Sequence, residues 1–352
     1  MGQCQWGIIE GSMSTLDTLG RPLRSLRISV TDRCNLRCHY CMPEDEYLWL
    51  PREDVLAYEE ISALSDLFGE MGVDRLRITG GEPLLRRDLP SLVAQLAQKP
   101  WLNDLAITTN GVLLADAAAE LQQAGLHRIT VGLDTLRADR FLALARRDSL
   151  PAVFAGIDAT RRLGFRDLKI DSVITRGDND DELADLLEYS RTVGAEVRFI
   201  EYMDVGGATR WRPDAVVSRA EMLSRLAERY GPIQPLPSAP SAPADRFQLP
   251  DGLSFGIIAS TTQPFCRTCD RARLTADGVL LLCLYAQHGT DLRRPLRAGA
   301  SRETMLNLLQ AVWRGRADRG AEERRSVPDR GTYIPLNVLK RDAHLEMHTR
   351  GG

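Results

Sequence analysis

The sequence has no long hydrophobic run and no leader-like start. Its 352 residues contain no apolar stretch of the roughly 18 residues that a membrane-spanning helix needs. The first ten residues, MGQCQWGIIE, lack the basic start and continuous apolar core of a secretory signal peptide. We therefore expect no membrane partner and a cytoplasmic location, where thiols stay reduced.

Excess positive charge is missing as well. The 45 Lys and Arg residues against 48 Asp and Glu give a net charge of −3 and a pI of about 6.0. Such a balance creates no overall field for nucleic acid, so an anionic substrate would need a local cluster of bases. With 43% apolar and 26% charged residues, the composition excludes disordered, collagenous and disulfide-dense classes.

Short β-type runs alternate with helical stretches through the first two thirds of the chain. The expected strands are Leu26–Thr31, Arg75–Thr79, Leu105–Thr109, Arg128–Asp134, Leu168–Ile174 and Glu196–Glu201. Helices are expected at Tyr58–Gly72, Glu182–Arg191, Arg219–Tyr230 and Arg302–Arg314, the second one capped by the polar run Asp178–Asp181. Six alternations predict a partial, TIM-like (β/α)6 barrel in the α/β class, with a doubly wound sheet as the alternative. Either fold gathers functional residues at the carboxyl ends of the strands.

The alternation ends near residue 205, and the composition suggests four regions. We expect an N-terminal segment at 1–24, the barrel at 25–230, a Pro-rich linker and connecting loop at 231–262, and a C-terminal region at 263–352. The last region carries the second cysteine group and a Gly-Gly tail.

Three cysteines follow the first expected strand in the spacing C-x3-C-x2-C: Cys34, Cys38 and Cys41. Three thiolates this close can hold one iron–sulfur cluster. A four-iron cluster would then lack one protein ligand, which leaves an iron open to chemistry. Structural zinc with His39 as fourth ligand is the alternative, but a residue wedged between ligands closes a tetrahedron poorly.

A second group, Cys266, Cys269 and Cys283, has the spacing C-x2-C-x13-C. One interpretation is a zinc ribbon completed by Cys4 or His288. The other is a second three-cysteine iron–sulfur cluster, again with an open iron. In that case Cys4 is an incidental thiol.

Basic residues recur inside otherwise apolar strands. They are Arg27, Arg77, Lys169 and Arg198 in the barrel, and Arg271 and Arg273 between the cysteines of the second group. The last two share one face if that segment is extended. Singly, each arginine is more simply explained by a structural ion pair. As a converging set they indicate a phosphate site, because the planar guanidinium suits phosphate oxygens.

The first cysteine group resembles the signature of the radical S-adenosylmethionine superfamily, as does Gly80-Gly81-Glu82-Pro83 after the second strand. The resemblance implies that S-adenosylmethionine chelates the open iron and is cleaved reductively to a 5′-deoxyadenosyl radical. It also implies contacts to S-adenosylmethionine from Tyr40, Gly81, Gly132 and Met203, with Tyr40 at the adenine and the glycine motif at the methionine amino group. From chemistry alone, the carboxylate of Glu82 can pair with an ammonium.

The second group narrows the resemblance to the GTP 3′,8-cyclases of molybdenum-cofactor biosynthesis. It is carried by Leu26–Pro43 and Phe265–Gly278, and extends from Asp17-Thr18-Leu19-Gly20-Arg21 to Gly351-Gly352. Met1 and Met13 both fit as translation starts, since no motif precedes Asp17. The family converts GTP into (8S)-3′,8-cyclo-7,8-dihydroguanosine 5′-triphosphate with two [4Fe-4S] clusters, guanine binding the open iron of the second. The alternatives are a radical paralogue acting on another nucleotide or a peptide, and a zinc-dependent nucleotide-binding protein.

This resemblance also implies substrate contacts and partners. The implied GTP contacts are Arg27, Arg77, Thr108, Lys169, Arg198, Arg271, Ala272 and Arg273, with Arg271 or Arg273 acting catalytically by polarising the base or the phosphates. The implied partners are an electron donor such as flavodoxin or ferredoxin and the downstream cyclic pyranopterin monophosphate synthase, with a homodimer as one assembly.

Three positions depart from the family pattern. Gly132 stands where many members carry serine, Asp270 replaces a commoner asparagine, and Arg350 replaces an aliphatic residue before the terminal glycines. The family inserts its Gly-Gly tail toward the active site. A mobile polar tail is the alternative for Gly351-Gly352.

Overall fold

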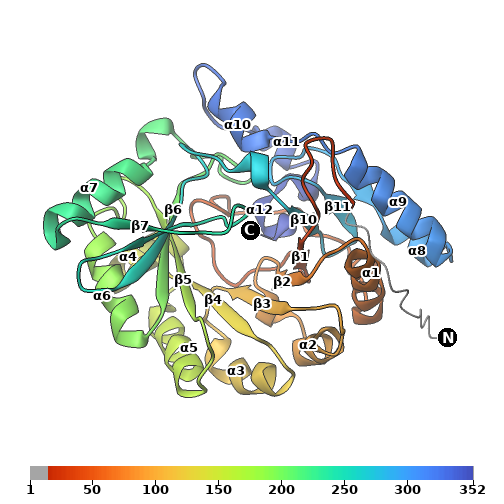
Figure 1. The fold of residues 1–352 in the computed structure, drawn as a ribbon, viewed down its shortest axis with the longest axis horizontal. Helices are drawn as coiled ribbons and strands as arrows, with labels where there is room; N and C mark the ends of the chain where they lie inside the picture. Colours follow the sequence, from red (N-terminus) through yellow and green to blue (C-terminus); the bar gives the residue numbers. More distant parts are fainter. Residues whose placement is uncertain (1–14, 352) are drawn as a thin grey trace.

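Six parallel strands form the centre of the sheet in the computed structural model, which describes residues 15–351 (Figure 1). They are β1 (Ser25–Ser29), β2 (Arg75–Thr79), β3 (Asp104–Thr109), β4 (Arg128–Gly132), β5 (Lys169–Ile174) and β6 (Glu196–Glu201). Because these strands neighbour one another in sequence order, the sheet never reverses as a doubly wound sheet must. The predicted partial barrel is confirmed, with strand ends shifted by no more than about two residues, as boundary predictions ordinarily are.

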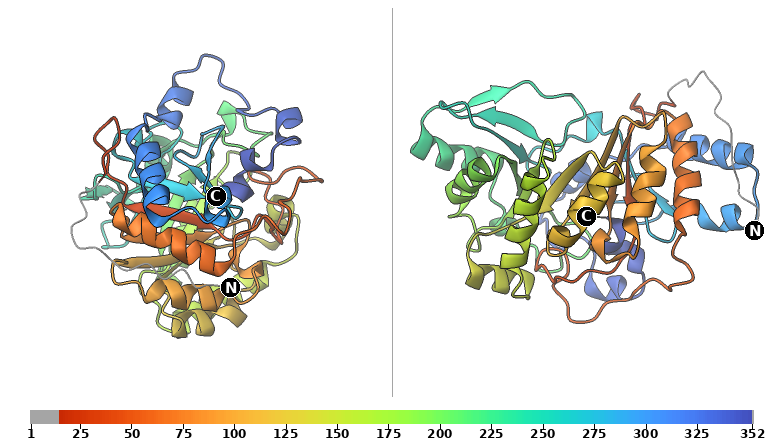
Figure 2. Two further views of the ribbon diagram at one scale, coloured as in Figure 1. Left: turned by 90° about the vertical axis from the view of Figure 1, so that its right-hand side faces the viewer. Right: turned by 90° about the horizontal axis from the view of Figure 1, so that it is seen from below.

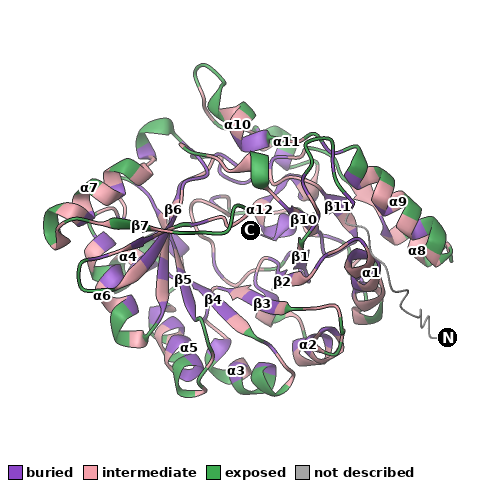
Figure 3. Ribbon diagram, viewed as in Figure 1, coloured by how far each residue is buried: buried purple, intermediate pink, exposed green. Residues whose placement is uncertain are grey.

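Helices cover the outer face of this curled sheet, as Figures 1 and 2 show. They are α1 (Tyr58–Glu70), α2 (Leu89–Ala97), α3 (Leu114–Gln123), α4 (Ala138–Ala145), α5 (Leu150–Arg162) and α6 (Leu183–Val193), followed by α7 (Arg219–Tyr230). In α1, Ile61, Leu64 and Phe68 recur at helical spacing and are fully buried. Burying each such side chain stabilises the fold by about 1.5–3 kcal/mol. The outward faces of these helices stay exposed (Figure 3).

The sheet extends beyond the six central strands at both ends. On one side β9 (Ser254–Ile258) pairs parallel with β6, followed by β8 (Asp245–Gln248) and β7 (Gln234–Leu236). Residues 231–262 therefore differ from the linker and loop that their prolines suggested, because the prolines sit in and around edge strands. On the other side β10 (Arg271–Leu274) pairs parallel with β1, followed by β11 (Val279–Leu281) and β12 (Thr290–Asp291).

The chain beyond the sheet is helical. It forms α8 (Arg293–Arg297), α9 (Arg302–Arg314), α10 (Gly320–Arg325), α11 (Leu336–Leu339) and α12 (Met347–Arg350). Helix α9 packs against α1, α10 and α11 lie on the side of the barrel opposite α2 and α3, and α12 lies near the centre of the ring (Figure 1). Within residues 15–351, no helix combines the length and the apolar character that crossing a bilayer requires.

Alternation along the strands separates an apolar outer layer from a polar interior. In β1, Leu26 and Ile28 belong to the main hydrophobic core, whereas Arg27 lies on the opposite side and lines a cavity. The same alternation holds in β3, where Ile107 packs in the core and Thr108 lines the cavity. The interior faces of these two strands thus contribute a charged and a hydroxyl side chain to the cavity.

Candidate active site

All six cysteines of the two groups line one cavity of about 360 Å³ at the carboxyl ends of the barrel strands. The cavity also receives many of the residues expected at the site: Arg27, Tyr40, Gly81, Thr108, Gly132, Met203, Arg271 and Arg273. Two cysteine groups more than two hundred residues apart in the sequence therefore face a single space.

Backbone hydrogen bonds hold the loop that carries the first cysteine group. Backbone N–H groups of Arg37 and His39 donate to carbonyls at the end of α4, each at 2.9 Å. A turn closes the loop, since the N–H of Cys41 donates to the Cys38 carbonyl at 3.0 Å. Burial raises the pKa of the Cys38 and Cys41 thiols. Holding them as thiolates therefore requires a bound cation such as iron.

The donor sets fit iron–sulfur clusters better than single zinc ions. Among residues 15–351, no three Cys, His, Asp or Glu side chains converge closely enough to hold one metal ion. His39 does not line the cavity, and its Nε2 lies 3.1 Å from Oδ2 of Asp178. His288 is exposed, and Cys4 lies outside the described residues. A cubic cluster instead takes one thiolate at each of three separate irons, which suits a spread triad.

The second cysteine group lies beside β10 and β11 and against α10. Cys266 opens a short 3₁₀ turn, Cys269 precedes β10, and Cys283 follows β11. Burial alone would raise the pKa of the Cys269 thiol. The positive charges of Arg271 and Arg316 outweigh this effect and lower the pKa of Cys269 to about 7. This group therefore sits in a locally positive environment, as reactive thiolates do.

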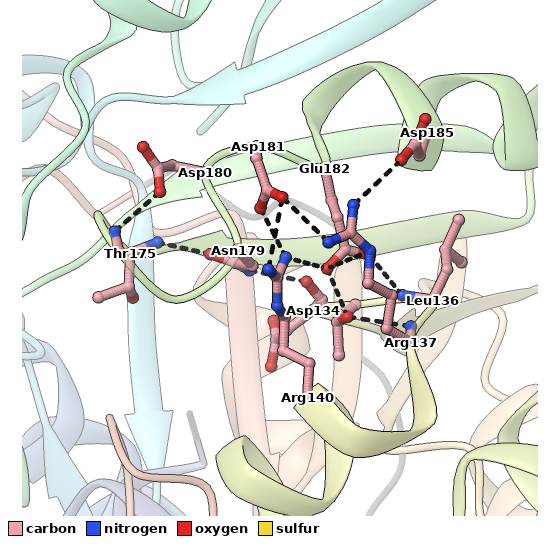
Figure 4. Close-up of polar contacts among 12 residues, drawn as sticks. Asp134, Leu136, Arg137, Arg140, Thr175, Asn179, Asp180, Asp181, Glu182 and Asp185 are labelled. Carbon is pink, nitrogen blue, oxygen red and sulfur yellow. Dashed lines mark hydrogen bonds and ion pairs between the residues drawn. The ribbon is translucent and has the colours of Figure 1, made fainter.

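Tyr40 is held by a polar network at the ends of β4 and β5. Its hydroxyl donates to Oδ2 of Asp134 at 2.9 Å, and Oδ1 of Asp134 accepts from the Val173 N–H at 2.8 Å. The side-chain amide of Asn179 donates to the carbonyls of Asp134 and Val173 (Figure 4). Tyr40 is thereby tied to two strands of the barrel.

The acidic residue that precedes α6 binds the loop after β4 rather than capping the helix. Glu182, the residue before α6, is buried and makes no capping bond to that helix. Its carboxylate instead accepts from Thr135 Oγ1 at 2.6 Å and from the Leu136 N–H at 2.8 Å, with Arg140 beside it (Figure 4). The carboxylate of Glu182, expected to act at the first turn of the helix, thus connects the loop after β4 to the start of α6.

The Gly-Gly-Glu-Pro motif joins the cysteine loop to the sheet. The N–H of Gly81 donates to the Thr31 carbonyl at 2.8 Å, and a Cβ on Gly81 would lie 2.4 Å from the Arg33 carbonyl oxygen. Only glycine allows this close approach. The motif therefore positions the segment that leads into Cys34.

Glu82 differs from its expected role as an ammonium partner. Its carboxylate is fully buried and accepts from Thr109 Oγ1 and the Asn110 N–H, each at 2.7 Å. Burial raises the pKa of Glu82 to about 7, and the residue does not line the cavity. Of the motif, Gly80 and Gly81 reach the cavity.

Two cavity residues were not identified from the sequence. Asn110 donates to Asn35 Oδ1 at 2.7 Å and lies 3.8 Å from Cys34 Sγ. Asp171 projects inward from β5, and its Oδ1 is buried without a hydrogen-bond partner among residues 15–351. The available signal was positional: Asn110 directly follows an expected strand, and Asp171 is a charged residue inside an otherwise largely apolar one.

Three arginines lie in register on adjacent strands. Arg77 of β2, Arg27 of β1 and Arg273 of β10 are paired directly across the parallel ladders. Burial, followed by the charge of Arg273 and then that of Arg77, lowers the pKa of Arg27 well below its usual range. Burial and the charge of Arg271 lower that of Arg273 to about 10. This arginine row is a local positive field that favours a polyanion.

The other expected GTP contacts do not line the cavity. Arg77 donates to Thr108 Oγ1 at 3.2 Å and to Thr130 Oγ1 at 3.0 Å. Lys169 is 8% exposed, and burial, with Arg198 and Arg128 nearby, lowers its pKa to about 8. Nε of Arg198 lies 3.4 Å from Glu196. The side chain of Ala272 packs in the hydrophobic core on the outer face.

The C-terminal residues reach the arginine row. Nη1 of Arg273 donates to the carbonyls of Gly351 and Arg350, the latter at 3.2 Å. The guanidinium of Arg350 is buried and donates to the carbonyls of Leu284 and His344, each at 2.6 Å. Gly351 is thus held at the site instead of belonging to a free polar tail, and Arg350 contributes an anchor that an aliphatic residue lacks.

The remaining two departures are accommodated locally. A Cβ on Gly132 would meet only the Thr109 carbonyl, at 3.9 Å, so the position has room for a side chain. Asp270 is buried and forms an ion pair with Arg75.

Two sequence profiles together match most of the chain. That of the Radical SAM superfamily matches residues 28–190, and that of Molybdenum Cofactor Synthesis C matches residues 195–322. Among solved structures, Streptococcus suis SuiB bound to its precursor peptide has a TM-score of 0.59 and 18% identity, covering 87% of this chain and 67% of that one. This likeness is one of fold alone.

Similar proteins of known name cover nearly the whole sequence. GTP 3′,8-cyclase 3 of Mycobacterium bovis is 58% identical over 340 residues, which is 96% of this chain and 90% of that protein. GTP 3′,8-cyclase 1 of Mycobacterium tuberculosis is also 58% identical, over 96% of this chain and 95% of its own length. The GTP 3′,8-cyclase of Aquifex aeolicus is 42% identical, with 96% and 99% covered.

Proposed function

Because this chain belongs to the GTP 3′,8-cyclase family, we propose that it converts GTP into (8S)-3′,8-cyclo-7,8-dihydroguanosine 5′-triphosphate, the first step of molybdenum-cofactor biosynthesis. The observation that carries this function is the meeting of both cysteine groups with Arg27, Arg271 and Arg273 in one cavity. Neither group alone would distinguish a cyclase from other radical enzymes.

The cofactors are S-adenosylmethionine and two [4Fe-4S] clusters, one on Cys34, Cys38 and Cys41 and the other on Cys266, Cys269 and Cys283. When bound and reduced, the first cluster and S-adenosylmethionine supply a 5′-deoxyadenosyl radical that takes the 3′-hydrogen of GTP. The remaining steps depend on how this chain binds and shields its substrates.

S-adenosylmethionine is proposed to bind between the first cysteine loop and the ends of β2, β4 and β6. Tyr40, Gly81, Gly132 and Met203 all line that part of the cavity. Tyr40 suits the adenine because Asp134 fixes its ring, and Gly81 leaves backbone polar groups accessible to the methionine end.

GTP is proposed to place its triphosphate against the arginine row. Arg27, Arg273 and Arg271 face the cavity, and their mutual repulsion is relieved by an anion of three to four charges. Arg77, in register with Arg27, and the residues Lys169 and Arg198 add positive charge from outside the cavity lining. Thr108 contributes a hydroxyl at the cavity, while Ala272 has only its backbone to offer.

Arg271 is the stronger candidate for a catalytic contact with the base. It stacks over Phe265, with the guanidinium carbon 4.6 Å from the ring centre. Its Nη2 is buried without a hydrogen-bond partner among residues 15–351.

Closing the C3′–C8 bond leaves an unpaired electron on the base, which needs one electron and one proton to become the product. A cation beside the base stabilises that reduction, and Arg273 is its neighbour on the same face of β10.

The proposal includes partners and a location. The electrons come from a donor such as flavodoxin or ferredoxin, and the product passes to cyclic pyranopterin monophosphate synthase. Thiolate-held clusters require a reducing compartment, which supports a cytoplasmic location. Analytical ultracentrifugation would show whether the assembly is a homodimer.

Anaerobic reconstitution tests this function directly. Protein supplied with GTP, S-adenosylmethionine and reductant should form 5′-deoxyadenosine and cyclised nucleotide in step. ATP or a peptide in place of GTP should give no cyclised product, and turnover on either would indicate a paralogue. Cys266→Ala with Cys269→Ala should retain uncoupled cleavage and lose cyclisation. Failure of the wild type to form 5′-deoxyadenosine would refute the proposal.

A further inference from the structure

Three charged side chains form a buried cluster beside the second cysteine group. Asp17, Arg21 and Arg316 are 7%, 2% and 2% exposed. Oδ2 of Asp17 accepts from Arg21 Nε at 2.6 Å and lies 3.4 Å from Arg316 Nη1. The N-terminal segment before β1 is thus joined to a residue just beyond α9, almost three hundred positions later. We refer to these three residues as the Asp17 cluster.

Both arginines of the Asp17 cluster contact the second cysteine group itself. Arg21 Nη1 donates to the Cys266 carbonyl at 2.7 Å, and Arg316 Nη1 donates to the Cys269 carbonyl at 2.8 Å. Arg316 Nη2 also lies 3.4 Å from Cys269 Sγ, which is hydrogen-bond distance for a sulfur acceptor. Two of the three cysteines are therefore held by charged donors.

The charge of this cluster exceeds what a mechanical support requires. Burying an ion costs several kcal/mol, and neutral groups could brace two carbonyls at lower cost. Two arginines and one aspartate leave a net charge of about +1 in a region of low dielectric, where its field acts strongly. Arg21 Nη2 and Arg316 Nε are buried without acceptors among residues 15–351. The two guanidinium groups are thus incompletely satisfied by the protein, although each already donates to a cysteine carbonyl.

We propose that Arg316 is a positioning residue for the second iron–sulfur cluster and raises its reduction potential, with Asp17 and Arg21 fixing its orientation. Hydrogen bonds and positive charge at a ligand sulfur favour the reduced, more negative state of a cluster. The inference rests on the proposed function in taking the second cysteine group as a cluster site. It also gives Asp17 and Arg21, which lie near the start of the sequence, a role in orienting a residue at the second cysteine group.

The test is a potentiometric titration of full-length, anaerobically reconstituted protein, monitored by electron paramagnetic resonance. A Cys38→Ala, Cys41→Ala background isolates the second-cluster signal. Arg316→Gln removes the positive charge and should make the midpoint potential more negative. Asp17→Asn removes the negative charge while keeping both arginines, and should shift the potential in the positive direction. Arg316→Lys should fall between wild type and Arg316→Gln.

Opposite shifts distinguish an electrostatic role from a structural one. Arg314→Gln is the matched control, because Arg314 is exposed on the same segment and should leave the potential unchanged. A potential that stays constant in Arg316→Gln at full iron content, or shifts in the same direction in Arg316→Gln and Asp17→Asn, would overturn the proposal. If Arg316→Gln fails to hold the cluster, Asp17→Asn and Arg316→Lys still give the sign of the shift in midpoint potential.

The same experiment separates this inference from the proposed function. Wild-type protein that holds both clusters and titrates reversibly but forms no cyclised nucleotide would refute the cyclase activity, while the variant potentials would still be measurable. Shifts of the wrong sign in a fully active enzyme would refute only the role of Arg316.

Discussion

The hydroxyl of Tyr40 donates a 2.9 Å hydrogen bond to Oδ2 of Asp134, which joins the first cysteine loop to the end of β4. Burial raises the pKa of Asp134 to about 6, although the Val173 N–H and Tyr40 both favour its charged form. A half-buried carboxylate that accepts two donors holds an aromatic ring in a defined orientation. The ring of Tyr40 thereby becomes a fixed wall of the cavity.

Tyr40→Phe and Asp134→Ala should each weaken binding of S-adenosylmethionine without removing the first cluster. A lost hydrogen bond to a charged group costs about 1.5–3 kcal/mol, which corresponds to about a tenfold or greater rise in Kd. Isothermal titration on reconstituted protein measures this change, and iron analysis confirms the cluster. Asp139→Asn, an exposed position in the first turn of α4, is the control. Unchanged Kd values in both variants would contradict the role of this pair.

Gly81→Ala should prevent assembly of the first cluster. The added methyl group would lie 2.4 Å from the Arg33 carbonyl oxygen, so the segment leading to Cys34 must shift. We expect reconstituted protein to bind about half the iron of wild type, since only the second cluster forms. Gly315→Ala is the matched control, because its nearest neighbour would be 3.5 Å away. Full iron content in Gly81→Ala would show that the loop tolerates the displacement.

The order of the barrel strands and the two cysteine groups could be predicted from sequence because each depends on local signals. Apolar alternation marks a strand, and close cysteine spacing marks a shared ligand set. Strand β7 was missed because proline normally argues against strand structure, whereas an edge strand tolerates it. Strands β8 and β9 contain no proline and were missed because prolines punctuate the segments before them. The contribution of Asn110 and Asp171 was missed for a different reason: their side chains reach the cavity only through the curl of the sheet.

Glu82 illustrates what sequence chemistry cannot decide. A carboxylate beside two glycines is equally suited to a ligand or to the protein backbone, and the outcome depends on which donors lie nearby. Here Thr109 and Asn110 approach from β3, a strand whose position relative to Gly81 is set by tertiary packing. The Asp17 cluster is a similar case, because its partners are separated by almost the whole chain.

Gly132→Ser should be tolerated and should tighten binding of S-adenosylmethionine. The position has room for a Cβ, and its backbone is not in the left-handed region, so serine introduces no strain. A hydroxyl facing the ligand adds one hydrogen bond, which is worth about 0.5–1.5 kcal/mol or up to about tenfold in Kd. Gly132→Ala adds the carbon without the donor and serves as control. Equal affinities in the serine and alanine variants would mean that the hydroxyl does not reach the ligand.

Affinity for GTP should fall as the pH rises through the pKa of Lys169. Burial, with the charges of Arg198 and Arg128, lowers this pKa to about 8 in the free protein. Below pH 8 the side chain is protonated and favours a phosphate, whereas above it the charge is lost. The Kd for GTP should therefore stay nearly level from about pH 6.5 to 7.5 and rise by up to about tenfold toward pH 9.

Binding of GTP near pH 8 should also take up protons, because the anion favours the charged amine of Lys169. Calorimetry in buffers of different ionisation enthalpy measures that uptake. Lys169→Arg keeps its charge across this range and should flatten the profile at high affinity, while Lys169→Met should flatten it at low affinity. A wild-type pH profile that persists in Lys169→Met would assign the titration to another group.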